Sequence, residues 1–400
     1  MTKRNPNIAK LKASYLFPEI RQRKKEFLAK HPAASLISLG VGDTTEPIPP
    51  QITHSLVNGA AQLGTREGYT GYGHEQGMEE LRTLIASKLY KNRVHPNEIF
   101  ISDGAKCDIG RLQLLFGGQA RIAIQDPAYP VYVDGSIMQG VSSMTFLPCL
   151  PENQFFPDLK DAVNADVIYF CSPNNPTGAV TTKAQLEQLV SFARANRSII
   201  IFDSAYFAYI QDPELPKSIF EIEGAREVAL ETCSFSKIAG FTGVRLGWTV
   251  IPKELHFEDG SSVHKDWSRI TSTIFNGASN IAQHGGIEVL DNQGIKEFNQ
   301  LIAFYMENAD IIKKAISDHG YEVYGGSHAP YLWVRFPGRN SWDVFQEFLE
   351  KLHIVTTPGS GFGLSGEGFL RLTAFGSRAS ILEAANRIRL HLGKKQDIKI

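Results

Sequence analysis

Residues 167–203 read VIYFCSPNNPTGAVTTKAQLEQLVSFARANRSIIIFD, and this stretch decides the fold class. It opens with the apolar run Val167–Phe170 and closes with the apolar run Ile199–Phe202, and both resemble strands that are buried on two faces. Between them, Thr182–Ala195 repeats apolar residues at i, i+3 and i+4 from Leu186, which predicts an amphipathic helix. A strand, a helix and a second strand in this order indicate an α/β sheet with helices on its faces.

Similar apolar runs flank this unit and extend the predicted sheet. They are Ile99–Ile101, Arg121–Ile124 and Val228–Leu230. Because ligands bind at the carboxyl ends of the strands in such sheets, we expect the functional residues directly after these runs.

The last quarter of the chain predicts a smaller α+β domain. Its expected elements are a helix over Ile295–His319, a strand over Tyr331–Phe336, a helix over Ser341–Leu352, a strand over Phe369–Ala374 and a helix over Arg378–Leu392. The segment around Lys10–Phe27 is expected to complete this domain. Because 400 residues are too many for one compact core, we expect two domains. The expected divisions are an N-terminal arm with part of the small domain at 1–47, a large domain at 48–290 and a small domain at 291–400.

Composition and charge argue against several other classes of protein. The formal net charge is −1, which favours neither nucleic-acid binding nor an anionic membrane surface. The first ten residues are polar and no apolar run reaches membrane-spanning length, so we expect a cytoplasmic protein. A cluster of basic residues near the N-terminus could form a local patch, although the solvated face of a helix explains it more simply. Its members are Arg21, Arg23, Lys24 and Lys25.

The four cysteines lie far apart in the sequence and include no Cys-x-x-Cys pair. They are Cys107, Cys149, Cys171 and Cys233. We therefore expect four buried, unreactive thiols in a reducing compartment, and neither a disulfide framework nor a metal site.

Polar residues follow two of the predicted strands. One group suggests an anion-binding site, and the other holds an asparagine side chain in a fixed direction. Residues 102–106, SDGAK, form a turn into a helix, and free backbone N–H groups at a helix start attract phosphate. An ordinary N-cap would explain the same residues. In residues 171–178, CSPNNPTG, two prolines and a glycine restrict the backbone and present Asn175 in a defined direction. A rigid connection between strand and helix is the alternative.

The next two strands are followed by a carboxylate and by an amine. Asp203 ends an apolar run, where a buried carboxylate needs a cationic partner such as a protonated pyridine nitrogen, unless it merely caps a helix. Lys237 lies among glycines, hydroxyls and Arg245, which suggests a buried amine of lowered pKa beside a phosphate site. Most lysines are solvated surface residues, so this residue alone carries little weight.

Taken together, these residues resemble a known family. The string SFSK-x-x-G-x-x-G-x-R-x-GW from Ser234 to Trp248 is similar to the lysine signature of class I/II aminotransferases of pyridoxal 5′-phosphate (PLP) fold type I. The string NNPTG at 174–178 and the Asp203-x-x-Tyr206 pair match in order and spacing. The resemblance extends from about Tyr15 to Arg371. It implies a large domain with a mostly parallel, seven-stranded sheet, a smaller α+β domain, and PLP as cofactor.

The resemblance also implies roles for the catalytic and ring-contacting residues. Lys237 would hold PLP as a Schiff base and then move the proton between the substrate α-carbon and the cofactor C4′ carbon. Asp203 would keep the pyridine nitrogen protonated, which makes the ring an electron sink. Tyr206 and Asn175 would hydrogen-bond the ring 3′-oxygen, and Tyr129 would stack on the ring face.

The phosphate and the substrate carboxylate are assigned in the same way. The phosphate would be held by Ser234, Ser236, Arg245, the N–H groups of Ala105 and Lys106, and Tyr72 of the partner subunit. Arg371 would clamp the substrate α-carboxylate bidentately.

A narrower resemblance concerns the LL-diaminopimelate aminotransferase group of this family. It rests on GVGDTTEP at 40–47, GYGHEQG at 71–77, SDGAKCD at 102–108, FNGASN at 275–280 and PGSGFG at 358–363. That group transfers an amino group between LL-2,6-diaminopimelate and 2-oxoglutarate, with tetrahydrodipicolinate and glutamate as the other pair, in lysine and cell-wall precursor synthesis.

The far end of diaminopimelate carries a second ammonium and a second carboxylate. Glu75, contributed across a homodimer, would face the ammonium, and Tyr15, Gly42, Lys106 and Asn276 would surround the carboxylate. Tyr129 and Asn175 would also contact substrate, and Asn276 would also lie near the cofactor. The alternatives are that Glu75 is an ordinary surface carboxylate near a helix start and that Asn276 is a turn residue.

Three hypotheses follow from the sequence. The first is an LL-diaminopimelate aminotransferase that works as a two-fold symmetric homodimer with composite sites, because Tyr72 and Glu75 would serve the neighbouring site. The second keeps the fold and cofactor but takes aromatic or other dicarboxylic amino acids. The third is a PLP-binding regulator or an inactive scaffold, which the complete set of catalytic residue types disfavours.

Overall fold

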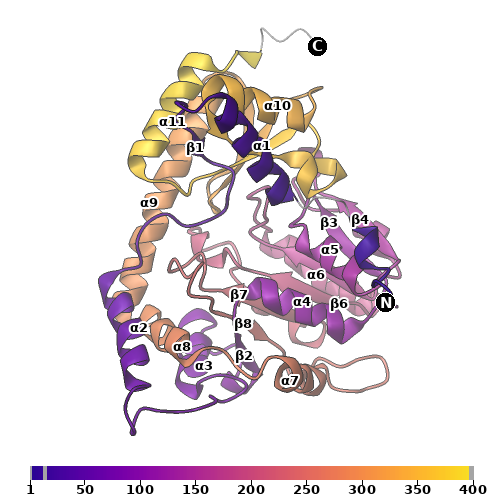
Figure 1. The fold of residues 1–400 in the computed structure, drawn as a ribbon. Helices are drawn as coiled ribbons and strands as arrows, with labels where there is room; N and C mark the ends of the chain where they lie inside the picture. Colours follow the sequence, from indigo (N-terminus) through magenta and orange to yellow (C-terminus); the bar gives the residue numbers. More distant parts are fainter. Residues whose placement is uncertain (1, 12–15, 396–400) are drawn as a thin grey trace.

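A seven-stranded sheet forms the centre of the larger part of the molecule (Figure 1). The structure is a computed structural model that describes residues 2–11 and 16–395. In spatial order the strands are β2 (Ile99–Ser102), β8 (Gly247–Val250), β7 (Ala229–Ser234), β6 (Ile199–Asp203), β5 (Val167–Cys171), β3 (Ile122–Asp126) and β4 (Met144–Pro148). All neighbouring pairs are parallel except those of β8, which is antiparallel to both β2 and β7.

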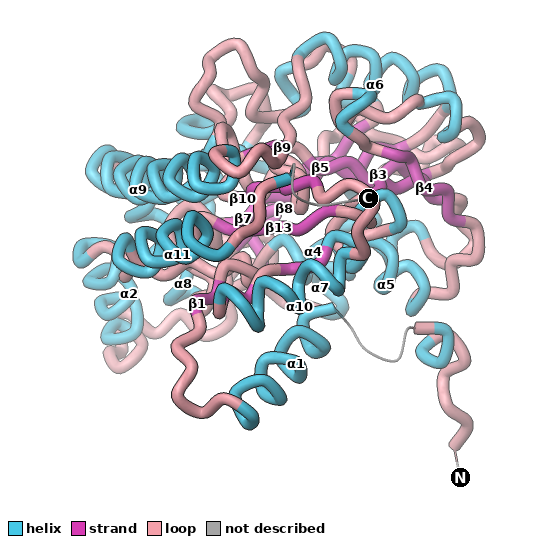
Figure 2. The backbone as a smooth tube through the Cα atoms, turned by 90° about the horizontal axis from the view of Figure 1, so that it is seen from above, coloured by secondary structure: helices cyan, strands magenta, loops and turns pink. Residues whose placement is uncertain are grey.

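Helices cover both faces of this sheet, so the inner strands are buried on two sides. Ile168 and Phe170 of β5 pack in one core cluster with Leu186 of α6 (Lys183–Asn196). Val167 and Tyr169 point the other way and pack in a second cluster. That second face is covered by α4 (Ala105–Phe116), α5 (Val131–Met138) and α7 (Val263–Ile274). Figure 2 shows α6 on one side of the strands and α4 and α5 on the other.

The smaller part of the molecule is built on a four-stranded antiparallel sheet. Its strands are, in spatial order, β12 (Thr357–Pro358), β13 (Phe369–Thr373), β10 (Tyr331–Arg335) and β9 (Glu322–Gly325). Its helices are α1 (Leu16–Lys30), α10 (Ser341–Glu347) and α11 (Arg378–His391). The N-terminal segment joins this part, since Leu16 and Phe27 lie in its core and β1 (Ile37–Ser38) pairs in parallel with β11 (Ile354–Val355).

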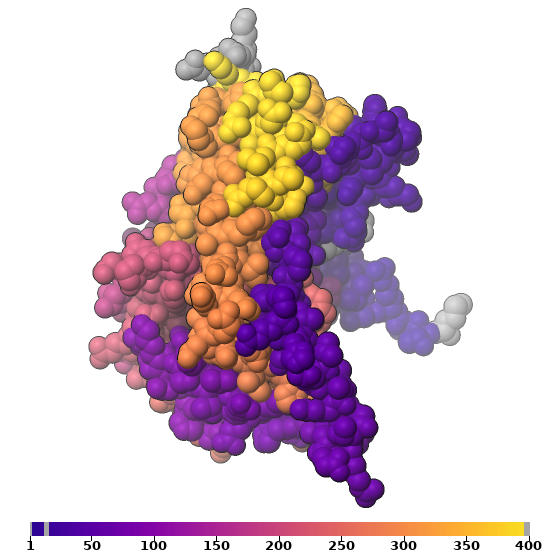
Figure 3. Space-filling view, turned by 90° about the vertical axis from the view of Figure 1, so that its left-hand side faces the viewer, coloured from indigo at the N-terminus to yellow at the C-terminus, as the bar shows by residue number. Residues whose placement is uncertain are grey.

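One long helix, α9 (Asn292–Ser317), belongs to both parts. Phe298 and Ile302 of its first half pack in the core of the large sheet, whereas Ile312 and Ile316 of its second half pack in the core of the small sheet. Figure 3 shows this helix, in orange, extending upward beneath the yellow C-terminal helix. The domain limits expected after residues 47 and 290 stay predictions.

The remaining elements are helices and turns. They are the α-helices α2 (Pro50–Gln62), α3 (Glu79–Leu84) and α8 (Asn280–Val289), the π-helical segments η2 (Ile85–Leu89) and η9 (Phe348–Leu352), and 3₁₀ turns at Ile8–Lys10, Pro96–Glu98, Pro151–Asn153, Leu159–Ala162, Phe207–Tyr209, Ile219–Glu221, Ala225–Glu227, Gly359–Phe362 and Leu364–Gly366. Across the two described ranges, no helix is both long and apolar enough to cross a membrane.

The five predicted strands of the large sheet are confirmed, and each extends further than its apolar run. Each of them ends on a residue that the pattern left out, because backbone pairing continues past the apolar side chains. These last residues are Ser102, Asp126, Cys171, Asp203 and Ser234. The helix expected over Ser341–Leu352 is α-helical only to Glu347 and continues as the π-helical segment. Three cysteines are buried as expected, but Cys107, in the first turn of α4, is only half-buried.

Candidate active site

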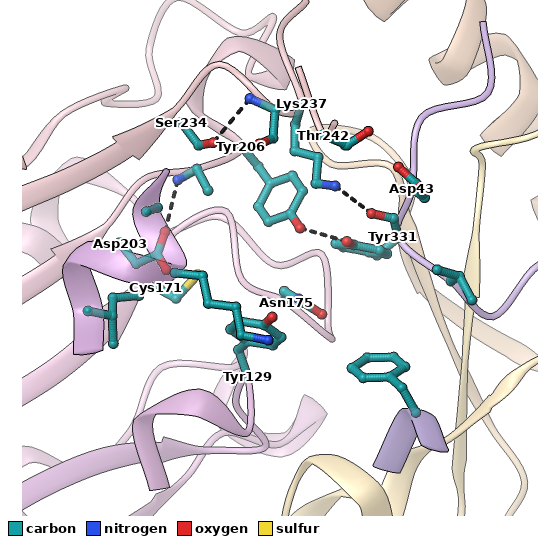
Figure 4. Close-up of a pocket in the computed structure, with 18 of the residues that line it drawn as sticks. Asp43, Tyr129, Cys171, Asn175, Asp203, Tyr206, Ser234, Lys237, Thr242 and Tyr331 are labelled. Carbon is teal, nitrogen blue, oxygen red and sulfur yellow. Dashed lines mark hydrogen bonds between the residues drawn. The ribbon is translucent and has the colours of Figure 1, made fainter. Parts of the chain in front are cut away.

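A cavity of about 710 Å³ opens at the carboxyl ends of the large-sheet strands, against β10 and β13 of the small sheet (Figure 4). Twelve of the sequence-predicted residues line it. They are Gly42, Ala105, Lys106, Tyr129, Asn175, Asp203, Tyr206, Ser234, Ser236, Lys237, Arg245 and Arg371. The structure therefore brings these residues together at one cavity, and their roles in a site stay predictions.

Lys237 follows β7 and projects its amine into this cavity (Figure 4). Its Nζ donates a hydrogen bond to the carbonyl oxygen of Gly42, and its side chain is half-buried because the amine opens onto the cavity. Burial lowers the pKa of this amine to about 8, and the carboxylate of Asp43 offsets part of the effect. A lysine in this state is a nucleophilic amine near neutral pH.

Asp203 ends β6 and is buried beside the cavity floor. Its Oδ2 accepts a hydrogen bond from the Tyr132 hydroxyl at 2.7 Å, and its Oδ1 accepts one from the backbone N–H of Ala205 at 3.0 Å. Both donors are neutral. Burial therefore raises the pKa of Asp203, and a cationic ligand atom would relieve the unfavourable burial of its charge.

Arg371 projects from β13 and is buried, with neutral acceptors only. One guanidinium nitrogen donates to Oδ1 of Asn175 at 2.7 Å and another to the carbonyl oxygen of Gly40 at 2.6 Å. Its Nε has no hydrogen-bond partner within the described chain. Burial lowers the pKa of the guanidinium, which nevertheless remains cationic. A buried arginine in this state is suited to a carboxylate ligand.

An anion cradle is formed where the start of α4 meets the turn after Lys237. The backbone at Gly104 has φ +117°, and a Cβ atom there would lie 2.6 Å from an Nη2 of Arg245. A Cβ atom on Gly247 would lie 2.8 Å from the Cα of Gly104. Glycine at these two positions therefore lets the helix start, the arginine and the hydroxyl of Ser234 approach one point. The backbone N–H of Ser236 donates to the Ser234 hydroxyl at 3.1 Å.

The segment after β1 closes the cavity from the side of the small sheet. The hydroxyl of Tyr305, on α9, accepts hydrogen bonds from the backbone N–H groups of Thr45 and Glu46 at 3.0 and 2.8 Å. This fixes the loop whose Gly42 carbonyl faces Lys237. The segment at 40–47 is thus held both by Tyr305 of α9 and by Lys237.

Three predicted residues lie on the surface of the described chain and do not line the cavity. Tyr72 is 88% exposed, and Glu75 and Asn276 are also exposed. Asn276 has φ +65°, and a Cβ atom on the adjacent Gly277 would lie 3.1 Å from the carbonyl oxygen of His74, so the two loops are neighbours. Tyr15 lies outside the described residues.

Several cavity residues escaped the sequence analysis. The main ones are Tyr331, Tyr132, Asp43, Phe17 and Arg21. Tyr132 lies only three residues after the predicted Tyr129, and the two rings meet edge to face at 6.2 Å. Arg21 is exposed on α1, as the solvated-face interpretation expects, yet it also forms part of the cavity wall.

The assembled groups fit one kind of ligand. The nucleophilic amine suits an aldehyde, the buried carboxylate suits a cationic ring nitrogen, and the glycine-lined cradle suits a phosphate. The partly unpaired arginine then remains for the carboxylate of a second molecule. No cluster of His, Cys, Asp and Glu side chains that could hold a metal ion occurs in the residues the structure describes.

Comparisons with known proteins agree with this chemistry. Residues 34–388 match the model of the family described as aminotransferase class I and II. The chain is 53% identical to the LL-diaminopimelate aminotransferase of Protochlamydia amoebophila (strain UWE25), over 97% of both chains. It is 55% identical to the chloroplastic LL-diaminopimelate aminotransferase of Arabidopsis thaliana, over 96% of this chain and 86% of the relative. A solved structure of the L,L-diaminopimelate aminotransferase from Chlamydomonas reinhardtii superposes with a TM-score of 0.94 at 56% identity, covering 97% of this chain and 98% of that one.

Proposed function

The chain belongs to the class I and II aminotransferases, and we propose that within this family it transfers an amino group between LL-2,6-diaminopimelate and 2-oxoglutarate. In the biosynthetic direction, glutamate would donate the amino group and tetrahydrodipicolinate would receive it. The observation that carries the proposal is the similarity to LL-diaminopimelate aminotransferases along nearly the whole chain.

The cofactor of this family is PLP, and the cavity residues fit it. When bound, PLP supplies an electron sink that makes the proton on the substrate α-carbon acidic. Lys237 would hold the cofactor covalently and, once released, would carry that proton. Asp203 would keep the ring nitrogen protonated, and the cradle of Ala105, Ser234 and Arg245 would hold the phosphate.

Two of the tyrosines that line the cavity and one amide would supply the remaining ring contacts. Tyr129 would stack on the ring, and the ammonium of Lys106 already lies 5.8 Å from the centre of the Tyr129 ring. Tyr206 and Asn175 would donate to the ring 3′-oxygen. Asn175 uses its Oδ1 to accept from Arg371, which leaves its NH₂ group directed elsewhere and suited to donate.

The charges in the cavity support a substrate with two carboxylates. The cationic side chains on its wall are Arg21, Lys106, Lys237, Arg245 and Arg371, and the carboxylates are Asp43 and Asp203. One arginine would bind the α-carboxylate and one would face the phosphate. Positive charge remains for a distal carboxylate, which diaminopimelate and 2-oxoglutarate both carry.

The distal ammonium of diaminopimelate needs a further carboxylate, and we propose that a second copy of the chain supplies it. The segment between α2 and α3 carries Tyr72 and Glu75 and projects from the lower edge of the molecule (Figure 3). Its neighbour is the loop of Asn276. In a two-fold symmetric homodimer these residues would complete the partner's cavity, so that a monomer would have two incomplete sites. Tyr15 is expected to lie near the same distal end of the substrate. The cytoplasmic location expected from the sequence also stays a prediction.

The visible absorbance of bound PLP tests the substrate proposal directly. LL-diaminopimelate should convert the spectrum to that of the aminated cofactor, and 2-oxoglutarate should restore it. Meso- and DD-diaminopimelate, glutamate, aspartate and tyrosine are measured in parallel. A spectrum that responds to tyrosine or aspartate but not to LL-diaminopimelate would contradict the proposal and favour an aromatic or dicarboxylic amino-acid aminotransferase.

Glu75→Gln tests the distal ammonium site separately. It should weaken the response to diaminopimelate and leave the response to glutamate nearly unchanged, because glutamate has no distal ammonium. Glu187→Gln, on the exposed face of α6, is the matched control and should change neither. Equal losses for both substrates would show that Glu75 does not bind the distal ammonium. Sedimentation of an active monomer would contradict the composite site.

A further inference from the structure

Tyr331 is the first residue of β10 and is fully buried, with its hydroxyl directed into the active-site cavity (Figure 4). The hydroxyl lies 2.6 Å from the hydroxyl of Tyr206, and the two rings meet edge to face at 5.1 Å. The hydrogen bond joins the small sheet to the large one. It also brings Tyr331 to the side chain that we expect to face the cofactor 3′-oxygen.

The same ring supports the arginine expected to bind the substrate carboxylate. Tyr331 pairs with Thr373 across β10 and β13, so Arg371 is its diagonal neighbour on the same face of the sheet. The guanidinium carbon of Arg371 lies 4.5 Å from the centre of the Tyr331 ring. At this distance the ring attracts the cation and restricts where its plane can lie.

A third contact involves the loop that faces Lys237. A Cβ atom on Gly42 would collide with the Tyr331 hydroxyl, so only glycine lets the loop pass at this point. The carbonyl oxygen of the same Gly42 accepts the hydrogen bond from Lys237. One tyrosine thus touches the groups expected to serve the substrate carboxylate, the cofactor ring and the catalytic amine.

We propose that Tyr331 is a positioning residue that couples the substrate-carboxylate arginine, Arg371, to the cofactor-facing hydroxyl of Tyr206. The two hydroxyls lie 2.6 Å apart and either of them can donate. In the arrangement that we propose, the Tyr331 hydroxyl donates to the Tyr206 oxygen, which leaves the Tyr206 proton for an acceptor in the cavity. Donation in series polarises each bond and strengthens the next one. The ring of Tyr331 meanwhile holds Arg371 in the plane that two carboxylate oxygens require.

The inference rests on the proposed function only for the roles of Arg371 and Tyr206. Its first test does not depend on which amino acid the enzyme transfers. The absorbance of the bound cofactor changes with pH as the linkage to Lys237 loses its proton. A hydrogen bond to the ring 3′-oxygen favours the form without that proton, because the negative charge on the oxygen is then uncompensated.

Tyr331→Phe removes one hydroxyl and keeps the ring. It should raise the midpoint of the absorbance titration by about half a pH unit, as expected for the loss of a hydrogen bond. The same substitution made in a Tyr206→Phe background should not move the midpoint further. An unchanged midpoint in Tyr331→Phe, or the same shift in both backgrounds, would overturn the coupling through Tyr206.

Tyr331→Leu removes the ring as well and tests the contact with Arg371. The dissociation constant of a simple carboxylate inhibitor should rise roughly tenfold in Tyr331→Leu and less than about twofold in Tyr331→Phe. Equal dissociation constants for these two variants would overturn this half of the proposal.

Tyr321→Phe is the matched control, since this buried tyrosine of the small domain donates to the carbonyl of Gly393 away from the cavity. Tyr321→Phe should change neither the midpoint of the absorbance titration nor the dissociation constant of the inhibitor. A midpoint shift as large as that in Tyr331→Phe would show that the effect is only structural. Thermal unfolding of each cofactor-free variant establishes that it folds.

Discussion

Arg371 and Asn175 are 196 residues apart in the sequence and are joined by a 2.7 Å hydrogen bond between the two parts of the molecule. The arginine comes from a strand of the small sheet and the amide from the turn after β5 of the large one. Any ligand that binds Arg371 through a carboxylate must therefore lie at the junction of the two sheets. With the roles proposed for Arg371 and Asn175, this one contact would place the substrate carboxylate and the cofactor ring side by side.

Arg371→Lys should reduce kcat/KM for every α-amino acid substrate. Lysine keeps the charge but cannot donate two parallel hydrogen bonds to a carboxylate, so about 2–3 kcal/mol, or roughly a hundredfold in kcat/KM, should be lost. Steady-state kinetics with two chemically different amino donors measures the loss. Arg335→Lys is the control, because Arg335 lies on the neighbouring strand β10 and pairs with the exposed Glu152. A loss confined to one donor would indicate that Arg371 binds the side chain of the substrate and not its α-carboxylate.

Asp203→Asn should stabilise the cofactor-free protein and inactivate the enzyme. The folded-state pKa of Asp203 is raised by burial, so its contribution to stability falls as the pH rises from the unfolded-state pKa through the folded-state pKa. At neutral pH the buried charge is a net cost that the amide removes. We therefore expect a higher melting temperature for the cofactor-free variant, and the difference should shrink in acid. With PLP bound, the variant should lose most of its activity, because the ring nitrogen has lost its counter-charge.

Glu254→Gln is the comparison for the Asp203 variant. Glu254 is an exposed carboxylate whose pKa is lowered by its hydrogen bond with Arg226, so the opposite pH dependence is expected for it. A cofactor-free Asp203→Asn protein that melts below the wild type at neutral pH would show that the two hydrogen bonds to Asp203 outweigh its desolvation.

The pH dependence of cofactor attachment should report the lowered pKa of Lys237. The neutral amine attacks an aldehyde, so the rate at which PLP reconstitutes the cofactor-free protein should rise with a midpoint near pH 8. Because the folded-state pKa lies below the unfolded value, the stability of the cofactor-free protein should also rise with pH between about 8 and 10.5. Asp43→Asn removes the charge that raises this pKa and should move the midpoint to lower pH. A midpoint near that of an ordinary lysine would refute the desolvation of this amine.

The sequence predicts five strands of the large sheet, because each contains a run of apolar residues, but it ends them too early, by one residue in β2, β5 and β6, by two in β3 and by four in β7. Asp203 and Asn175 were identified on this basis and from the family motif. β4 was missed because Met144–Pro148 is an edge strand with one exposed side and only Leu147 fully buried. β8 was missed because Gly247–Val250 begins within the glycine-rich lysine motif.

Contacts between distant segments could not be predicted from the sequence. Tyr331 and Tyr206 are 125 residues apart, and no local pattern relates a strand residue of the small sheet to a turn of the large one. The sequence around Arg21 predicts a solvent-exposed helix residue, which it is. That Arg21 also lines the cavity depends on how α1 packs, and the sequence does not show this. Tyr72, Glu75 and Asn276 are exposed in the single chain, so neither sequence periodicity nor the fold of one subunit places them in a site.

Gly104→Ala should weaken binding of the cofactor phosphate while the protein remains folded. An added Cβ would meet the Arg245 guanidinium, and φ +117° is unfavourable for any residue with a side chain, so strain of about 1–3 kcal/mol is expected at the start of α4. Arg245 would have to move out of the cradle. The dissociation constant of PLP, measured by equilibrium dialysis, should therefore rise roughly tenfold or more.

Gly110→Ala is the matched control, because Gly110 lies within the same helix and a Cβ atom there meets nothing within 4 Å. That substitution should stabilise the helix by about 0.5–1 kcal/mol and leave PLP affinity unchanged. If both variants bind PLP as tightly as the wild type, the phosphate is not held at the start of α4.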